Sequence, residues 1–220
     1  AIEATLGFVA NVEYATDQVA VISFSGTLDE LGGTLSWEQN TTLHTSLTDS
    51  QTAVEAAVNA INPDFTQCTV TNSDGTRKLQ CLTFIGGGLQ AAYDELNSSR
   101  ARSSAKKCVI LLTDGANNGC DIDPEDVADQ MRNEGFILCV IALAVSDGDG
   151  VRPCDGSSVL PVKTWLATLT NCDLFFDAPT TADLPDVYSR MPRILCDNDG
   201  DPCHSQPAAT IAFPCTATAP

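Results

Sequence analysis

Positive charge and long apolar runs are both scarce in this 220-residue sequence. The longest apolar run, residues 136–145, has ten residues, whereas a helix that crosses a bilayer needs about 20. Eleven Lys and Arg residues stand against 29 Asp and Glu, which gives a net charge of −18. Nucleic acids and anionic membrane surfaces attract basic proteins, so we expect neither as a partner, and no transmembrane segment. The acidic excess favours solubility or loose recruitment of divalent cations.

Groups for nucleophilic or acid–base catalysis are also few. The sequence has two His residues, His44 in a predicted edge strand and His204 near the C-terminus, and no Gly-x-Ser-x-Gly turn. The Gly triplet at 86–88 could cradle a phosphate, but it lacks the Lys of a P-loop and the spacing of a dinucleotide fingerprint. We therefore expect no catalytic residues and no enzymatic activity.

Cysteine, by contrast, is abundant, with ten residues, which is unusual for a reduced compartment. The absence of Cys-x-x-Cys and the low His count disfavour zinc, so we expect up to five disulfides and an extracellular, secreted protein. No cationic start precedes an apolar core, and we expect that any secretion signal has been removed. Asn40 and Asn97 open Asn-x-Ser/Thr sequons, which are typical of a glycoprotein.

Two disulfides can be predicted from local sequence. Cys68–Cys81 enclose a Ser-Asp-Gly turn between β-prone arms, which predicts a surface hairpin closed by a bridge. Cys196–Cys203 flank a turn-rich gap of six residues that would let them meet. The complete connectivity stays open, because ten cysteines allow on the order of a thousand complete pairings.

Residues 106–115, Lys-Lys-Cys-Val-Ile-Leu-Leu-Thr-Asp-Gly, predict the strand around which the fold is organised. Four consecutive apolar residues at 109–112 are too few for a helix and indicate a strand buried on both faces. The strand ends in a hydroxyl and the carboxylate of Asp114, at the sheet edge where open α/β folds bind ligands. Cys108 here and Cys139 in the next buried strand are expected to be free thiols or to link to helices.

Elsewhere, helical and strand patterns alternate. Further strands are predicted at 19–24, 35–47, 136–145 and 174–176, and helices at 1–14, 49–61, 86–99, 123–135, 161–169 and 182–195. Residues 146–158 read as a Gly/Asp-rich loop. The alternation predicts an α/β fold with an open, mostly parallel, doubly wound sheet, helices on both faces and right-handed crossovers.

Two motifs give this pattern a family resemblance. Thr-x-x-Gly-x-x-Leu beginning at Thr83, followed by a strand that ends in Thr-Asp-Gly at Asp114, resembles the von Willebrand factor A-type domain over roughly residues 1–195. The resemblance implies a metal-ion-dependent adhesion site in which Thr83 and Asp114 help to hold a divalent cation, Mg²⁺ or Ca²⁺. The family's first strand and its Asp-x-Ser-x-Ser signature, which supplies the other ligands, are missing from the N-terminus. We therefore expect a weak or degenerate metal site and no other cofactor.

The missing strand would lie at the centre of the sheet, between the strands at 19–24 and 109–112. Its absence would leave two rows of buried backbone groups unpaired, at several kcal/mol for each group. After an acidic linker at 196–207, the tail at 208–220 contains one unassigned apolar segment, which includes Ile211 and Phe213. The residues that follow resemble the signature, with Pro214 for Asp and with Thr216 and Thr218 for the two Ser.

Four explanations for the missing strand and the tail are open. It could fold back into the slot of its own molecule, or enter the slot of the next molecule as a donated strand. It could also be a plain, glycosylated connector, or the first strand could lie upstream of the residues given. Of the two strand versions we favour donation, because an acidic, disulfide-stapled module suits a durable fibre.

These features together indicate a secreted adhesive or structural module of an extracellular assembly or filament. Its expected partners are proteins, either copies of itself or other extracellular matrix or filament proteins. The alternative is a soluble, divalent-metal-dependent protein-binding domain of the adhesion type, and a secreted enzyme is a third class. Cation-dependent binding of a partner would favour the second class, and turnover of a substrate would favour the third.

Overall fold

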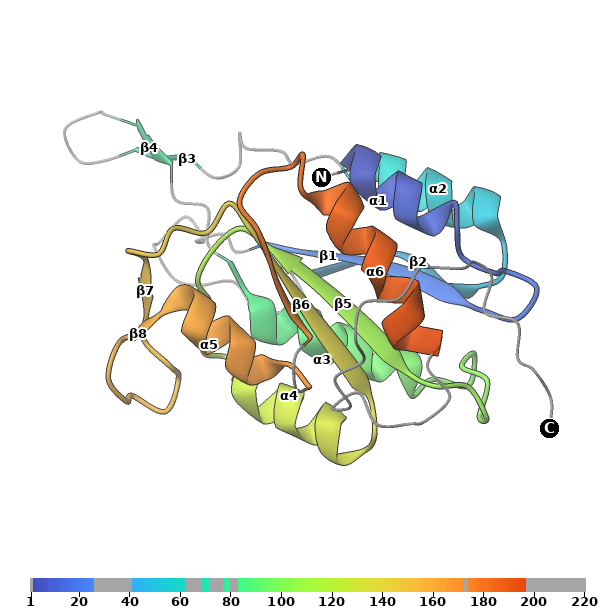
Figure 1. The fold of residues 1–220 in the computed structure, drawn as a ribbon. Helices are drawn as coiled ribbons and strands as arrows, with labels where there is room; N and C mark the ends of the chain where they lie inside the picture. The colour runs from blue at the N-terminus through green and yellow to red at the C-terminus, as the bar shows by residue number, and fades with distance from the viewer. Residues whose placement is uncertain are drawn as a thin grey trace.

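Helices and strands alternate along the chain (Figure 1). The computed structural model describes residues 2–25, 41–61, 69–71, 77–79, 83–171 and 174–196. No helix in these residues is both long enough and apolar enough to cross a membrane. The elements are α1 Ile2–Val9, β1 Val19–Phe24, β2 Thr41–Thr48, α2 Gln51–Ala60, β3 Thr69–Thr71, β4 Arg77–Leu79, α3 Ile85–Leu96, β5 Cys108–Thr113, α4 Pro124–Asn133, β6 Ile137–Leu143, β7 Gly150–Val151, β8 Leu160–Pro161, α5 Val162–Leu169, β9 Phe175–Ala178 and α6 Leu184–Cys196.

A parallel sheet of β5, β6 and β9 forms the centre of the fold. Ile110 lies opposite Cys139, and Ile141 lies opposite Phe176. The five middle residues of β6, 138–142, are fully buried, because this strand has a neighbour on each side and helices on both faces. The apolar run at 136–145 is therefore a buried strand, as its composition predicts.

A separate antiparallel ladder pairs β1 with β2. Its register runs from Val19 opposite Thr48 to Phe24 opposite Thr41, with two irregularities near Val21. Within the residues that the structure describes, no strand pairs with both β1 and β5. The sheet is therefore interrupted between these two strands.

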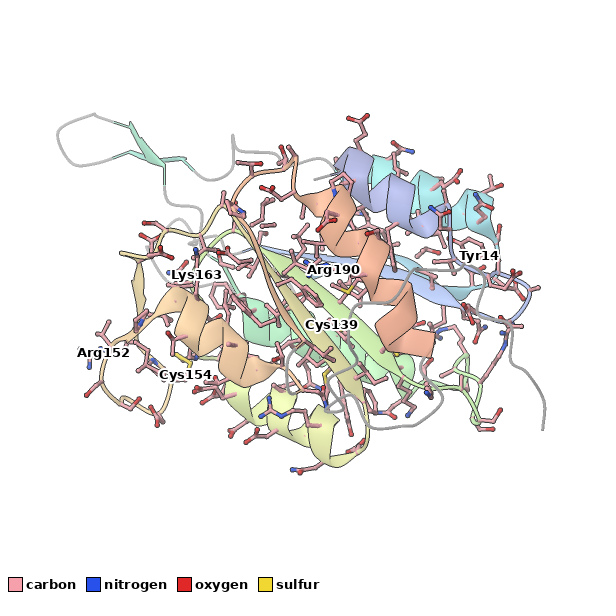
Figure 2. The ribbon with its side chains drawn as sticks, in the orientation of Figure 1. Tyr14, Cys139, Arg152, Cys154, Lys163 and Arg190 are labelled. Atoms are coloured by element: carbon pink, nitrogen blue, oxygen red, sulfur yellow. A yellow bond between two sulfur atoms is a disulfide. The ribbon has the colours of Figure 1, made fainter. Side chains whose placement is uncertain are left out.

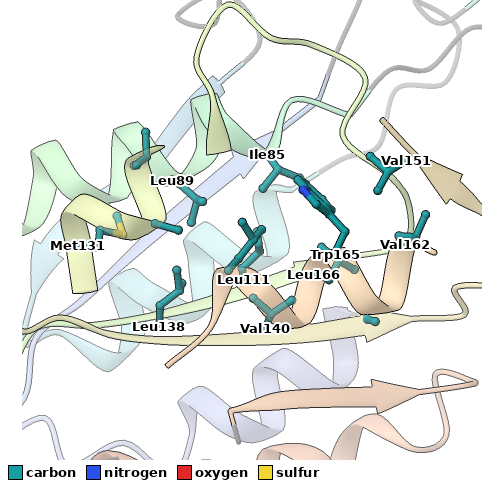
Figure 3. Close-up of a cluster of buried hydrophobic side chains, with 14 of the residues drawn as sticks. Ile85, Leu89, Leu111, Met131, Leu138, Val140, Val151, Val162, Trp165 and Leu166 are labelled. Carbon is teal, nitrogen blue, oxygen red and sulfur yellow. The ribbon is translucent and has the colours of Figure 1, made fainter. Parts of the chain in front are cut away.

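Helices cover both faces of the sheet, as the alternating pattern predicts (Figure 1). On one face α3, α4 and α5 bury Leu89, Met131 and Trp165 against β5 and β6 (Figure 3). On the other face Tyr188 and Met191 of α6 pack on β6 and β9, together with residues of α1. The helix α2 packs beside α1 and β1 on this second face.

Local sequence explains where most helices begin and end. The Asp123 carboxylate accepts a hydrogen bond from the Glu125 N–H at 2.9 Å, and Pro124 occupies the first turn of α4, as the sequence predicts. Ser50 caps α2 in the same way. The predicted helix at 1–14 ends early, at Val9, because the Asn11 side chain donates to the Gly7 carbonyl and diverts the backbone.

Two other predictions need correction. The strands at 19–24 and 109–112 are less buried than expected: in β1 only Val21 is buried, and in β5 Val109, Ile110 and Leu112 are partly exposed. Among the described residues, each of these strands pairs with one other strand, so one of its edges is open. The loop predicted at 146–158 contains β7, which pairs with β8. The hairpin expected within 68–81 is present as the β3–β4 ladder, and residues 35–40 of the predicted edge strand lie outside the described residues.

Candidate functional site

An open groove of about 950 Å³ lies where the sheet is interrupted. Every residue of β1 and every residue of β5 lines it. Phe8 of α1 and Tyr188 of α6 line one face, and Leu89 and Ala92 of α3 line the other. The groove thus has the four boundaries of a strand position: two strand edges and two helical layers.

The residues of β5, which line the groove, are more exposed than those of β6. Both strands are apolar, yet Leu138 to Ala142 of β6 have 0 % exposure while Val109, Ile110 and Leu112 of β5 stay partly exposed. The β6 edge on one side pairs with β5 and on the other with β9. The composition of β5 therefore fits a strand with two neighbours, whereas its described surroundings supply one.

The two strand edges that face the groove run in the same direction. Phe24, the last residue of β1, packs against Gly88 in the first turn of α3, where an added Cβ would lie 2.6 Å from the Phe24 ring. The end of β5 also reaches this point, since the hydroxyl of Thr83 lies against Gly115. At the opposite edge the Arg102 side chain, before β5, donates to the Thr16 carbonyl, before β1. A strand in the groove could pair in parallel with both.

The groove is open to solvent, so water can fill it wherever no chain segment does.

Of the predicted metal ligands, Asp114 lines the groove, and Thr83 lies near Gly115, the residue that follows Asp114. A Cβ on Gly115, next to Asp114, would lie 3.8 Å from Oγ1 of Thr83. Asp114 is exposed and lines the groove mouth. The carboxyl end of β5 thus carries a carboxylate and a hydroxyl, the hard oxygen ligands that Mg²⁺ and Ca²⁺ prefer.

Asn117 and Asn118, which sequence reasoning missed, hold this edge in place. Asn118 exchanges two hydrogen bonds with the backbone of Thr83: its Oδ1 accepts from the Thr83 N–H at 3.0 Å, and its N–H donates to the Thr83 carbonyl at 2.8 Å. Asn117 Oδ1 accepts from the Ile85 N–H at 2.9 Å, the start of α3, which has no side-chain cap of its own. The signal in the sequence is the Asn-Asn-Gly run that begins one residue after the Thr-Asp-Gly strand end.

The described donors fit a divalent cation only in part. Asp114 and Thr83 supply two kinds of oxygen, and the described residues contain no group of three or more His, Cys, Asp or Glu that could hold a metal. An octahedral Mg²⁺ site needs six oxygens, which waters can complete. The other two candidates, Thr216 and Thr218, lie outside the described residues.

A Ser–His contact lies on the β1–β2 ladder and was also missed. Ser23 Oγ is 2.8 Å from His44 Nε2, and Ser23 lines the groove. An activated serine also needs a group that orients the His and donors for an oxyanion. No described carboxylate contacts His44. We interpret the contact as a cross-strand pair, brought about by the irregular register that sequence patterns do not predict.

The described cysteines divide into bridged and free. Cys120 and Cys154 form a disulfide that ties the loop after β5 to the loop before β8, a pairing that was not predicted. Cys108 and Cys139 are free, and burial raises the pKa of each thiol to about 12. Figure 2 shows Cys139 within the sheet and Cys154 beside α5. The side chains of the predicted pairs Cys68–Cys81 and Cys196–Cys203 lie outside the described part.

Of the two predicted glycosylation sites, the structure describes one. Asn97 is exposed at the C-terminal end of α3, where a glycan would meet no packed surface. Its Oδ1 accepts a hydrogen bond from the Lys107 ammonium group. Asn40 lies outside the described residues.

The fold and this edge of the sheet agree with a known family. The von Willebrand factor type A domain profile matches residues 1–153, more than half of the sequence. The chain belongs to the von Willebrand factor type A domain family, as the two motifs at Thr83 and Asp114 predict. No curated protein matches the chain.

Solved structures share the fold at low sequence identity. Proximal thread matrix protein 1 from the mussel byssus is 21 % identical, with a TM-score of 0.59 over 89 % of this chain and 40 % of that one. A further structure of it, at 22 % identity and TM-score 0.55 over 85 % and 38 % of the two chains, has a zinc-occupied MIDAS motif. The chain thus spans less than half of the mussel protein.

Two bacterial pilus proteins are similar as well. The pilus adhesin SpaC from Lactobacillus rhamnosus GG is 16 % identical, with a TM-score of 0.58 over 86 % of this chain and 27 % of that one. The vWF domain of the type V pili tip protein Mfa5 from Porphyromonas gingivalis is 12 % identical, with a TM-score of 0.60 over 97 % and 90 %. At these identities the likeness concerns the fold.

Proposed function

We propose that this protein is an adhesive or structural module of an extracellular assembly, and that it is not an enzyme. The observation that carries the proposal is the position of Thr83 beside the end of β5 that carries Asp114. This is the edge at which open α/β sheets bind ligands, and the hydroxyl and carboxylate oxygens there are suitable ligands for hard cations. The solved neighbours, a matrix protein of a mussel thread and two pilus proteins, support this role.

Binding at this edge would suit a protein partner with an acidic group. Asp114 and Thr83 would hold a divalent cation, Mg²⁺ or Ca²⁺, and a bound cation would supply an open coordination position to a carboxylate of the partner. Without the cation, the net charge of −18 would repel an acidic partner. A soluble, cation-dependent binding domain is the second candidate, and it depends on the same pair of residues.

Sedimentation of the full chain with Mg²⁺ and with EDTA tests the proposal. We expect the chain to self-associate as its concentration rises. If the carboxyl end of β5 forms part of the contact, Asp114→Ala should weaken this self-association. Asp94→Ala is the matched control, because Asp94 is an exposed carboxylate on α3 that bonds Gln90. A chain that stays monomeric at high concentration under both conditions would contradict the self-assembling module.

A further inference from the structure

We propose that the Cys120–Cys154 disulfide is a redox-sensitive switch that positions the candidate cation site at the carboxyl end of β5. In the oxidised state the bridge holds the loop after β5, residues 114–122, against the start of α3, and reduction by a thiol releases this loop. The inference rests on the proposed function, because it names a regulation of the same site. Its structural part, the anchoring of the loop, is testable without any cation.

The loop after β5 and the start of α3 form one tightly packed unit. The side chains of Asn117 and Asn118 accept hydrogen bonds from backbone N–H groups within residues 83–85. A Cβ on Gly119 would lie 1.8 Å from the Phe84 ring, so the backbone of the loop lies directly on that ring. A shift of the loop must therefore move the segment at 83–85 as well.

Cys154, at the other end of the bridge, belongs to a part of the fold with anchors of its own. It lies beside α5 (Figure 2) and between β7 and β8, which pair Val151 with Leu160. Val151 is 3 % exposed and packs in the core with residues of α5. The Val162 N–H at the start of α5 donates to the Asp149 carbonyl at 2.9 Å. These contacts hold Cys154 in place, and none of them involves the loop after β5.

The disulfide is the covalent link between these two parts. The hydrogen bonds described for residues 114–119 run within the loop, to Thr113 or to residues 83–85, apart from a 3.8 Å contact between Asn117 Nδ2 and the Cys154 sulfur. The bridge joins positions 34 residues apart, and opening it returns to the loop the freedom that a closed ring removes. Reduction therefore leaves the loop held on the side of α3 alone.

Reduction also changes the hydrogen bonds around Asn117. The Cys154 sulfur lies 3.9 Å from the Gly119 carbonyl oxygen, to which the Asn117 side chain donates. A disulfide sulfur has no hydrogen to donate, whereas a thiol is a weak donor. The released Cys154 thiol can thus compete with Asn117 for this carbonyl and loosen the side chain that accepts from the Ile85 N–H.

The bridge is open to exchange with a small thiol or a protein dithiol. Cys120 is exposed, so a thiolate can attack its sulfur, and the Cys154 sulfur leaves with the bonding electron pair and takes up a proton. A second thiolate then displaces Cys120 from the mixed disulfide. Two external thiols are oxidised to a disulfide, and the two protein sulfurs each gain one hydrogen. The free thiols Cys108 and Cys139 lie within β5 and β6 and take no part.

Amide hydrogen exchange on the full chain, without added cation, tests the anchoring of the loop. Reduced glutathione serves as the thiol, and alkylation with peptide mapping shows which cysteines it has reduced. We expect the amides of Thr83, Ile85 and residues 115–119 to exchange faster by about tenfold or more after reduction, through local opening. The amides of β6 and β9 should stay protected, and reoxidation should restore slow exchange at the loop.

A variant without the bridge provides the matched control. Cys120→Ser combined with Cys154→Ser should show the fast exchange at Thr83 and Ile85 without any thiol, and glutathione should then change nothing further there. The variant thus separates this bridge from any disulfide among the cysteines outside the described part. Titration with Mg²⁺ is the second readout: reduction and the double substitution should each weaken binding by about 10–100-fold, as the loss of groups that position metal ligands does.

Three results would overturn the proposal. Unchanged exchange at Thr83 and Ile85 after reduction would show that the loop keeps its place without the bridge, even if the double variant fails to fold. An equal rise throughout β6 and β9 would make the disulfide a general staple of the fold. A bridge that glutathione leaves intact in the native protein would not be a switch. Absence of Mg²⁺ binding in both states would instead contradict the proposed function, and the exchange at Thr83 and Ile85 would still decide whether the disulfide positions the loop.

Discussion

Replacement of Asn117 by Ala removes only a small side chain, but it should destabilise the domain strongly. Asn117 is 9 % exposed. Its Oδ1 accepts from the N–H of Ile85, a fully buried residue, and its Nδ2 donates to the carbonyl of Gly119. The substitution leaves one donor and one acceptor unsatisfied, each at a cost of about 1–3 kcal/mol. We expect a loss of about 2–6 kcal/mol in the free energy of unfolding.

Urea unfolding with linear extrapolation measures this loss. Asn117→Asp keeps the acceptor for Ile85 and removes the donor to Gly119, so it should retain more of the stability than the Ala variant. Asn133→Ala is the control: Asn133 is exposed on α4, and such a position should change the free energy by no more than about 0.5 kcal/mol.

The result that would refute this reasoning is a loss below 1 kcal/mol for Asn117→Ala with an unchanged denaturant slope. Such a result would mean that water replaces both hydrogen bonds. The start of α3, and with it the position of Thr83, would then not depend on the loop after β5.

Three further predictions concern the site and the thiols. Isothermal calorimetry should find weak Mg²⁺ and Mn²⁺ binding, because Asp114 is the one candidate carboxylate ligand among the described residues of the site. Submicromolar binding abolished by Asp114→Ala would contradict this. Cys108 and Cys139 should resist alkylation at pH 8 in the native protein, since a pKa of about 12 leaves about one thiol in 10,000 ionised. In the unfolded chain these thiols ionise near pH 9. Their contribution to the stability of the fold is therefore complete below pH 9 and falls as the pH rises toward 12. Rapid alkylation of either thiol in the native protein would show that the thiols are not buried. Ser23→Ala should leave hydrolysis of activated esters at the background rate, and a drop in a measurable rate would reveal catalysis by the Ser23–His44 pair.

The sequence predicts most elements because their signals are local. The capping Asp123 with Pro124 defines the start of α4, and ten apolar residues at 136–145 define β6. The position of Thr83 near the strand end that carries Asp114 also follows from the family resemblance. These features depend on a few neighbouring residues, or on a motif that spans one strand and one helix.

What could not be predicted depends on contacts between distant segments. The bond from Asn117 to Ile85 joins residues 32 positions apart, and the contact of Ser23 with His44 needs an irregular register. The Cys120–Cys154 bridge cannot be chosen from ten cysteines by spacing alone. The partial exposure of β5 depends on which strand lies beside it, and the residue pattern within β5 does not indicate its neighbours.

The most direct test of the central claim is a titration of the uniformly labelled, full-length protein with Mg²⁺, followed by nuclear magnetic resonance. Binding at the carboxyl end of β5 should shift the backbone amide signals of Thr83 and of residues 114–118. Asp114→Ala should abolish these shifts, and Asp94→Ala should leave them unchanged. No shift at these residues, or equal shifts in the Asp114→Ala variant, would contradict the account.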